Sequence, residues 1–349
     1  MVSGKIAPPP GGSLAIHGQP EQAIDAGQAM RRYLLAVILG AMLASFSFLG
    51  LLGALQFKGI LPPPGIANSE CVDEKLAFLR RNNPRNPNLL VIGSSVAWRH
   101  FDGSIAVKTS PGTAPLNGGF CGLSTNQIAF TAHWLLERVP SIKQVIMITA
   151  PQDFESCKDS PEVFNADSAD RFVFRNASKW PFYFHYFDPV SLIRNVKIAI
   201  DRKADKPTPN PMIFTQYGDG PLYVGHANGL VYGKLDRLDP GCFEALRAMA
   251  LAFRAQHRSF MVVMTPINPA WQSLYDSDRR LMKSFGTDLG KTLNGTNAQL
   301  WNADADAGLQ QAAFTDAIHL RWSAVGPLSQ MIMQRLHPAN PAPAPATPN

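Results

Sequence analysis

The sequence predicts an α/β protein, a three-layer α/β/α sandwich around a mostly parallel sheet, with one transmembrane helix before it. Short, continuously apolar runs alternate with longer segments of helical periodicity, as expected of strands buried on both faces of a parallel sheet. The second observation is an uncharged stretch of 25 residues, Tyr33 to Phe57. This stretch is long enough to cross a bilayer, because about 20 residues span the hydrocarbon.

The predicted strands are four short apolar runs, 88–92, 143–149, 260–265 and 299–302. The predicted helices of the same domain are 125–138, 241–257, 279–293 and 323–336. Strands that alternate with helices favour a parallel sheet covered on both faces. Residues 155–238 interrupt the alternation and are interpreted as an insertion, helical at 190–200 and with a candidate hairpin after Gly220.

The other segments are predicted to be tails and a connector. Residues 1–32 contain PPPGGS and are expected to form a disordered cytoplasmic tail. Residues 58–87 contain LPPPG and NNPRNPN, which indicates a stiff stalk before a domain at 88–337. Residues 338–349, rich in Pro and Ala, are expected to be disordered.

Charges beside the apolar stretch predict its orientation. Arg31 and Arg32 precede it directly, whereas Glu70 and Asp73 follow it. The positive-inside rule therefore places the first 32 residues in the cytoplasm and the domain outside. We expect a single-pass protein of the bacterial inner membrane with a periplasmic or otherwise extracytoplasmic domain. The alternative, a cleaved signal peptide, is disfavoured because its apolar region is only about 7–15 residues long.

Charge and cysteine content exclude some classes of function. The net charge is +6, but Lys and Arg are scattered and form no basic run, so nucleic acid is not an expected partner. The net positive charge is interpreted as a source of attraction to an anionic membrane surface or glycan. In an oxidising compartment the four cysteines predict one or two disulfides, with three pairings open: Cys71, Cys121, Cys157 and Cys242. No C-x-x-C spacing occurs, so no metal site is predicted, and no cofactor is expected.

Three side chains predict the chemistry. The first strand leads directly into Gly93-Ser94-Ser95, where a glycine allows a sharp turn that presents Ser95 at the start of a helix. Ligands of open parallel sheets bind at this edge, beyond the carboxyl ends of the strands. Asp316 precedes His319 by three residues, a spacing that lets the carboxylate reach the imidazole and fix its tautomer. A serine nucleophile requires such a general base.

In order and context, these motifs resemble the SGNH, or GDSL, hydrolase superfamily over residues 88–336. The Gly93-Ser94-Ser95 turn corresponds to the nucleophile block, and Asn117 to Thr125 resembles the second block, with Gly122 in the oxyanion role. Asp316 and His319 match the last block. Two positions depart from the family: Ser94 stands where it has Asp, and its Gly-x-Asn-Asp block is replaced by 149–153. Gln152 is therefore expected to supply the side-chain donor of the oxyanion hole, together with the backbone N–H groups of Ser95 and Gly122.

The Gly-Ser-Ser turn and the Pro-Gln pair are similar to the membrane-anchored D-alanyl transfer protein of lipoteichoic acid synthesis and to exopolysaccharide O-acetyltransferases. The resemblance implies acyl transfer from an acyl donor to a cell-surface or secreted glycan, often beside a multispanning membrane O-acyltransferase. An esterase would share the chemistry up to the acyl-enzyme. A generic lipid esterase is a weaker alternative. The alternative from another class is an inactive scaffold, a structural subunit of a polysaccharide synthesis or export complex.

Four further polar residues near the expected site are weighed against structural roles. His100 and Asp102 follow Ser95 closely and could form a different dyad, but they are interpreted as surface or capping residues. Asp153 and Asn268 lie at strand ends and are candidates for substrate binding. Loop capping is the alternative that we favour for both.

Overall fold

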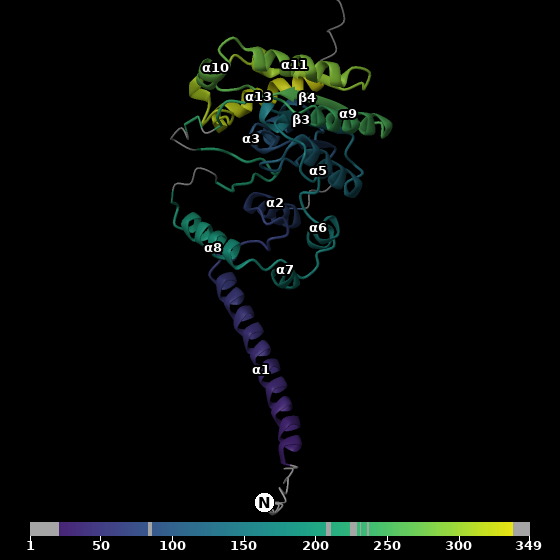
Figure 1. Cartoon of the computed structure of the whole chain (residues 1–349). Helices are drawn as coiled ribbons and strands as arrows, with labels where there is room; N and C mark the ends of the chain where they lie inside the picture. Colours follow the sequence, from purple (N-terminus) through teal and green to yellow (C-terminus); the bar gives the residue numbers. More distant parts are fainter. Residues whose placement is uncertain are drawn as a thin grey trace, which may run out of the picture. The chain divides into compact units, whose positions relative to one another are not determined.

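A computed structural model of the chain describes residues 21–82, 86–206, 211–223, 229–230, 232–235 and 237–337. Its centre is a five-stranded sheet in the order β2-β1-β3-β4-β5, and every pairing is parallel. The strands are β1 (Leu89–Ile92), β2 (Pro115–Asn117), β3 (Gln144–Thr149), β4 (Ser259–Met264) and β5 (Gln299–Asn302). Figure 1 shows β3 and β4 surrounded by helices. The predicted α/β class is confirmed, and β2 is a strand that the apolar runs did not predict.

Both faces of the sheet are covered by helices. Along a strand, successive side chains point to opposite faces. In β3, Val145 and Met147 belong to one apolar cluster and Ile146 and Ile148 to another. The first cluster includes residues of α2 (Glu70–Arg81), α5 (Thr125–Arg138), α9 (Pro240–Ala255) and α11 (Arg280–Leu293). The second includes residues of α4 (Gly103–Thr109) and α13 (Trp322–Leu336). The arrangement is the three-layer sandwich that the sequence predicts.

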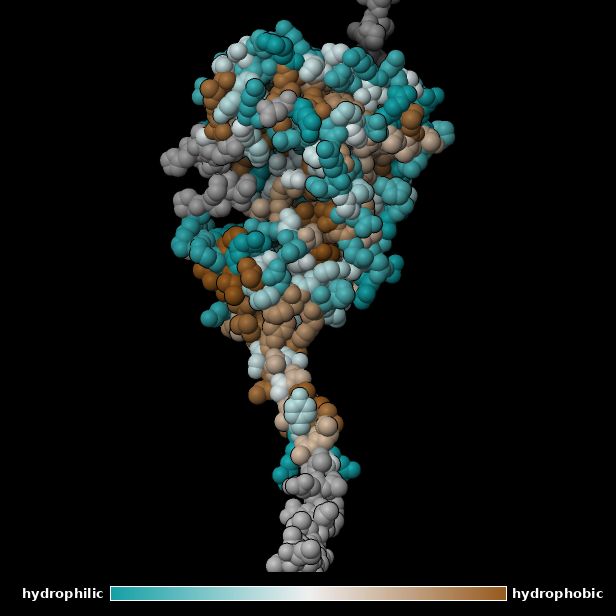
Figure 2. All heavy atoms as spheres, viewed as in Figure 1, coloured by the Kyte–Doolittle hydropathy of each residue, from teal (hydrophilic) through white to brown (hydrophobic). Residues whose placement is uncertain are grey.

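The chain forms two compact units, Met1–Leu61 and Pro62–Asn349. In the first unit, α1 (Glu21–Phe57) is one helix, and its segment Gly27–Phe57 is long and apolar enough to cross a membrane. Figure 2 shows apolar side chains along its surface. The helix begins at Glu21, so the prediction of a disordered tail up to residue 32 is wrong for residues 21–32. Residues 1–20 and 338–349, also predicted to be disordered, lie outside the described residues.

The prediction of a stalk over residues 58–87 is wrong for its central part. Residues Glu70–Arg81 form α2, which buries Val72, Leu76 and Leu79 in the core of the second unit. These apolar side chains recur at helical spacing, so α2 places one face on the core. The folded unit therefore starts well before residue 88.

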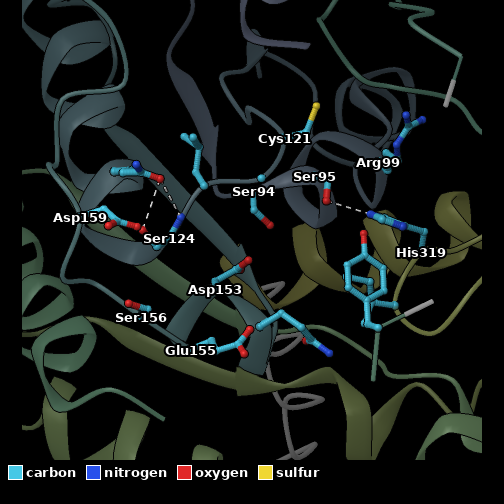
Figure 3. Close-up of a pocket in the computed structure, with 16 residues that line it drawn as sticks. Ser94, Ser95, Arg99, Cys121, Ser124, Asp153, Glu155, Ser156, Asp159 and His319 are labelled. Carbon is cyan, nitrogen blue, oxygen red and sulfur yellow. Dashed lines mark hydrogen bonds between the residues drawn. The ribbon is translucent and has the colours of Figure 1, made fainter. Parts of the chain in front are cut away.

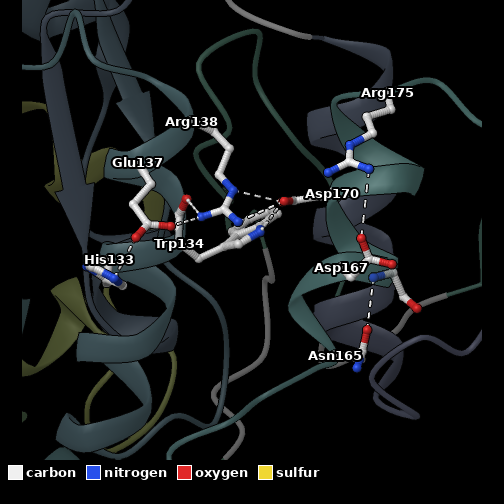
Figure 4. A network of polar contacts seen from close by, with 9 residues as sticks. His133, Trp134, Glu137, Arg138, Asn165, Asp167, Asp170 and Arg175 are labelled. Atoms are coloured by element: carbon white, nitrogen blue, oxygen red, sulfur yellow. Dashed lines mark hydrogen bonds and ion pairs between the residues drawn. The ribbon is translucent and has the colours of Figure 1, made fainter.

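The described part of the insertion contains three helices joined by irregular segments. The 3₁₀ turn η1 (Pro151–Phe154) directly precedes it, and its helices are α6 (Ala166–Val173), α7 (Trp180–His185) and α8 (Pro189–Lys203). Asp170 of α6 accepts hydrogen bonds from Trp134 and Arg138 of α5, which ties the insertion to the central domain (Figure 4). The candidate hairpin after Gly220 falls partly outside the described residues, and residues 220–223 and 229–230 contain no strand.

Two disulfides join segments far apart in the sequence. Cys71 of α2 pairs with Cys121, and Cys157 after η1 pairs with Cys242 of α9. The sequence left the three pairings open, and the structure selects this one. Disulfides persist in oxidising compartments, which is where the sequence predicts that this domain lies.

The short elements complete the second unit: α3 (Ser95–Arg99), α10 (Pro269–Tyr275), α12 (Ala303–Asp306) and η2 (Gln311–Ala313). Each of the eight segments predicted as a strand or helix of the domain has a counterpart whose ends differ by no more than two residues. The predicted helix 190–200 corresponds to α8. The three candidates for a catalytic triad lie on α3 and on the loop that precedes α13.

Candidate active site

Ser95 is presented by a tight turn between β1 and α3. The turn depends on Gly93, whose φ of +143° is rarely adopted by residues with a side chain. A Cβ at this position would lie 2.4 Å from the carbonyl oxygen of Ile148 and 2.5 Å from the Cβ of Ala97. Only glycine therefore allows the chain to pass this close to β3 and turn into α3. Ser94 caps the helix, and Ser95 is its first residue.

The loop before α13 is folded around the carboxylate of Asp316. One carboxylate oxygen accepts hydrogen bonds from the backbone N–H groups of Ile318 and His319, at 2.9 and 2.8 Å. The other accepts from Nδ1 of His319 at 2.7 Å. The backbone closes on itself, since the N–H of Thr315 donates to the carbonyl of His319 at 2.8 Å. The Asp-x-x-His spacing thus encodes a local turn that fixes one side of the imidazole.

The opposite nitrogen of His319 reaches the serine. Its Nε2 atom lies 2.8 Å from Oγ of Ser95 (Figure 3), although the two residues are 224 positions apart in the sequence. Asp316 and His319 are 6% and 5% exposed. Burial raises the pKa of Asp316, but hydrogen bonds from His319 and from the Ile318 and His319 backbone outweigh burial and lower the pKa overall. The carboxylate is therefore ionised and faces the imidazole. The structure brings the three predicted residues into one hydrogen-bonded chain.

Ser95 and His319, two of the three residues in this hydrogen-bonded triad, line a pocket of about 580 Å³. The pocket is lined by the following residues: Ser94, Ser95, Arg99, Cys121, Gly122, Leu123, Ser124, Gln127, Gln152, Asp153, Glu155, Ser156, Asp159, Tyr232, Ile318 and His319. In Figure 3, Ser124 and Asp159 lie across the pocket from Ser95 and His319. A cavity of this size accommodates a small ligand or part of a larger one.

The residues predicted for the oxyanion hole all line this pocket. Gly122 has a φ of +72°, and no atom lies within 4 Å of where its Cβ would be, so the glycine leaves this wall open. The amide nitrogen and oxygen of Gln152 are shielded from solvent and have no hydrogen-bond partner among the described residues. Buried amide groups are normally paired. A bound group with donor and acceptor atoms would satisfy the side chain of Gln152.

Asp153, a predicted substrate contact, lines the pocket but is engaged by its own surroundings. Its carboxylate accepts hydrogen bonds from Oγ1 of Thr149 at 2.8 Å and from the N–H of Ala150 at 3.1 Å. Burial raises its pKa to about 6, although hydrogen bonds from Ser94, Thr149 and Ala150 act in the other direction. Asp153 therefore holds the end of β3.

Asn268 does not line the pocket, so the prediction that it binds substrate is not supported. Its side-chain oxygen accepts from the N–H of Ala270, as the N-cap of α10. Its Nδ2 donates to the carbonyl of Asp316 at 2.8 Å, and its own N–H donates to Ala317. Asn268 is a capping residue, as favoured from the sequence, and it also anchors the Asp316 loop.

His100 is the C-cap of α3, so it has the capping role that the sequence offered, but it is not a surface residue. Its side chain is 0% exposed, and its ring lies between Thr265 and Leu320. Asp102 is a capping residue, because its carboxylate accepts from the N–H groups at the start of α4. A short-range pattern could not identify His100, since its partners are 165 and 220 positions away in the sequence.

Both disulfides border the pocket. Cys121 is itself a lining residue and precedes Gly122, whereas Cys157 follows the lining residue Ser156. Asn126 adds a second restraint, because its amide donates to the carbonyls of Cys157 and Asp159. The pocket walls are thus held by covalent and hydrogen bonds. Within the described ranges, no group of three or more His, Cys, Asp or Glu side chains is placed to hold a metal ion.

No protein-family model and no curated protein matches the chain. Among solved structures, the native aryl esterase of M. smegmatis is similar with 10% identity and a TM-score of 0.36, covering 72% of this chain and 99% of its own. A carbohydrate acetylesterase family member from Sinorhizobium meliloti has 8% identity and a TM-score of 0.34, covering 72% and 100%. A second carbohydrate acetylesterase from Sinorhizobium meliloti has 12% identity and a TM-score of 0.34, covering 72% and 98%. These values are too low to establish a shared family or activity.

Proposed function

We propose that the protein is a serine acyl-transfer enzyme of the SGNH type, an O-acyltransferase or esterase that forms an acyl-enzyme on Ser95. One observation carries the proposal: Ser95, His319 and Asp316 form a continuous hydrogen-bonded chain that opens into a pocket. A serine becomes a nucleophile when an oriented base removes its proton. Here the base is oriented by an ionised carboxylate on its far nitrogen.

In the proposed reaction, Nε2 of His319 takes the hydroxyl proton while Oγ of Ser95 bonds to the acyl carbon of an ester. Asp316 stabilises the imidazolium. The negative charge on the tetrahedral oxygen is held by the backbone N–H groups of Ser95 and Gly122 and by the amide of Gln152. An oxyanion-hole donor contributes on the order of 3 kcal/mol in enzymes where it has been removed. The intermediate collapses, the ester C–O bond breaks, and His319 returns the proton to the departing alcohol.

The second half-reaction decides between transferase and esterase. A hydroxyl group of an acceptor, or water, gives its proton to His319 and attacks the acyl-enzyme, and Ser95 is released with its proton restored. The far wall of the pocket carries hydrogen-bonding side chains, including Ser124 and Asp159, and Gln127 also lines the pocket. Such groups suit a polyhydroxylated molecule. We therefore propose a cell-surface or secreted glycan as the substrate or acceptor, with the acyl donor entering beside Ser95.

The proposed location is the outer side of a bacterial cytoplasmic membrane. The apolar helix α1 supports single-pass anchoring, and Arg31 and Arg32 support a cytoplasmic N-terminus. The disulfides Cys71–Cys121 and Cys157–Cys242 support an oxidising compartment. A multispanning membrane O-acyltransferase is the partner that such an anchored enzyme would require for a donor made in the cytoplasm.

The test uses the full chain in detergent with p-nitrophenyl acetate and a fluorescent alkyl phosphonate. Wild type should release p-nitrophenol and become labelled, and Ser95→Ala should do neither. Ser273→Ala is the matched control, because Ser273 is an exposed residue of α10 whose hydroxyl bonds only its own helix. The proposal would be contradicted if Ser95→Ala and Ser273→Ala both lost p-nitrophenol release and labelling, or if both kept them. A folded wild-type protein that neither releases p-nitrophenol nor becomes labelled would favour the alternative function, an inactive structural subunit.

Transfer and hydrolysis are separated by adding acceptor oligosaccharides to the same reaction. A transferase should produce acylated oligosaccharide, visible by mass spectrometry, and should release p-nitrophenol faster when the acceptor resolves the acyl-enzyme. An esterase should release acetate at a rate that the acceptor does not change. Either result keeps the serine chemistry and assigns the second half-reaction.

A further inference from the structure

His100 is a fully buried polar side chain that the proposed reaction does not use. Nδ1 of its ring lies 2.7 Å from Oγ1 of Thr265, and Nε2 lies 2.9 Å from the backbone nitrogen of Leu320. Both ring nitrogens are therefore engaged. The ring also stands edge-on to that of His319, with centroids 6.3 Å apart.

The contacts fix the protonation state of the ring. A backbone N–H can only donate, so Nε2 of His100 must accept from Leu320 and carries no proton. The single proton is then on Nδ1 and is donated to Oγ1 of Thr265. Burial lowers the pKa of His100 well below its usual value, and the neighbouring His319 acts in the same direction. A neutral ring is the form that fits this position.

Three parts of the site meet at this ring. His100 is the C-cap of α3, the five-residue helix that begins at Ser95. Thr265 directly follows β4 and donates its own N–H to the carbonyl of Thr149 in the neighbouring strand β3. Leu320 is the residue after His319. The ring thus connects the element that carries the nucleophile to the loop that carries the base.

We propose that His100 is a positioning residue: it holds the backbone of the His319 loop in the position that allows Nε2 of His319 to hydrogen-bond to Oγ of Ser95. The inference rests on the proposed function. Without the bond to Leu320, the loop keeps its internal turn around Asp316 but loses the hydrogen bond from its backbone to the residue that ends α3. The two halves of the site can then move relative to one another, and a displacement of about 1 Å costs on the order of a hundredfold in rate.

Two substitutions separate the contacts of the ring. In His100→Gln, the amide oxygen can reach the position of Nε2 and accept from Leu320. In His100→Asn, the shorter amide can reach only the position of Nδ1 and contact Thr265. Both variants carry a neutral amide, so they differ mainly in whether the loop is held. The full chain in detergent is assayed with p-nitrophenyl acetate, and thermal unfolding is recorded for each variant.

We expect His100→Asn to lose about tenfold to a hundredfold in kcat with KM for the small ester unchanged. His100→Gln should recover most of this loss, even where the two variants unfold at the same temperature. Equal kcat losses in the two variants, or losses that follow the unfolding temperature alone, would overturn the proposal. If His100→Asn does not fold, Thr265→Val and Thr265→Ser replace the pair. Valine removes the acceptor of Nδ1–H and should lower kcat, whereas serine keeps it and should not; equal values would overturn the proposal.

A spectroscopic measurement keeps this test separate from the test of the proposed function. The proton between Nδ1 of His319 and Asp316 should give a low-field proton NMR resonance that disappears in His319→Gln. With the loop held, the resonance should be the same in wild type and His100→Gln. It should shift or broaden in His100→Asn, because Nε2 of the same imidazole no longer meets Oγ of Ser95. An unchanged resonance in all three would overturn the positioning role, even if the wild type proved to have no esterase activity.

Discussion

Replacing Asp316 by Asn reverses one hydrogen bond of the site while leaving its shape. The amide oxygen can still accept from the backbone N–H groups of Ile318 and His319, as the carboxylate does. The amide nitrogen then occupies the place of the oxygen that accepts from Nδ1 of His319. Two donors would face each other, so His319 shifts its proton to Nε2. That nitrogen then donates to Ser95 and cannot take its proton.

The size of the effect follows from this tautomer change together with the loss of the carboxylate beside the imidazolium. In a serine protease the corresponding change lowers kcat by about 10⁴. A decrease of this size corresponds to about 5.5 kcal/mol in the activation free energy. We therefore expect Asp316→Asn to lose on the order of 10³ to 10⁴ in kcat. The fold should persist, because the two backbone hydrogen bonds of the loop are retained.

The assay is steady-state hydrolysis of p-nitrophenyl acetate by the full chain, with the phosphonate labelling rate measured in parallel. Asp102→Asn is the matched control, since Asp102 caps α4 and asparagine is an equally good N-cap. The control should keep wild-type kcat within a few-fold. A loss of less than tenfold in Asp316→Asn, with circular dichroism showing a folded protein, would refute the role assigned to Asp316.

Three further predictions concern stability and are checked by chemical or thermal unfolding. Burial raises the pKa of Asp73 to about 7 from 3.8, so its cost to the fold appears as the pH rises between these values; Asp73→Asn should stabilise the protein by about 2–4 kcal/mol at pH 8 and have little effect at pH 4. Gly93→Ala should cost about 3 kcal/mol or more and abolish labelling by the phosphonate, because the added Cβ would meet the carbonyl of Ile148. The double variant Cys157→Ser/Cys242→Ser should lower the free energy of unfolding by about 2–4 kcal/mol, and reductant should destabilise the wild type more than this variant, which keeps only the Cys71–Cys121 bond.

Strong apolar patterns predicted most of the sheet. The runs at β1, β3 and β4 are continuous because both faces of these strands are buried, and such runs stand out from the sequence around them. The strand β2 lacks this signal, since it has only three residues and begins with Pro115. It pairs with the edge of β1, and only the tertiary structure reveals the pairing.

The prediction of a stalk over residues 58–87 rests on the proline-rich motifs at both ends of this segment, and these motifs say nothing about the residues between them. The apolar spacing of Val72, Leu76 and Leu79 was present in the sequence and indicates an amphipathic helix. Buried Lys75 obscured that pattern, since lysine is rarely buried. Its ammonium group donates to the carbonyl of Gly218, a partner 143 positions away that no local pattern contains.

The site was predictable where its chemistry is local. The Asp316–His319 turn is encoded by four consecutive residues, and the Ser95 turn by the preceding glycine at residue 93. The burial of His100 was not predictable, because its ring contacts Thr265 and Leu320, which approach it only when β4 and the His319 loop come together. Sequence reasoning thus identified the reactive groups and missed a residue that joins them.

The most direct test of the central claim is peptide mapping of the full chain after reaction with the phosphonate. A serine acyl-transfer enzyme should carry the phosphonyl group, at one per chain, on the peptide that contains Ser95, and fragmentation should place it on that residue. Prior denaturation, or the substitution Ser95→Ala, should abolish the adduct. A folded wild type with no adduct, or with the group on another residue, would contradict the account.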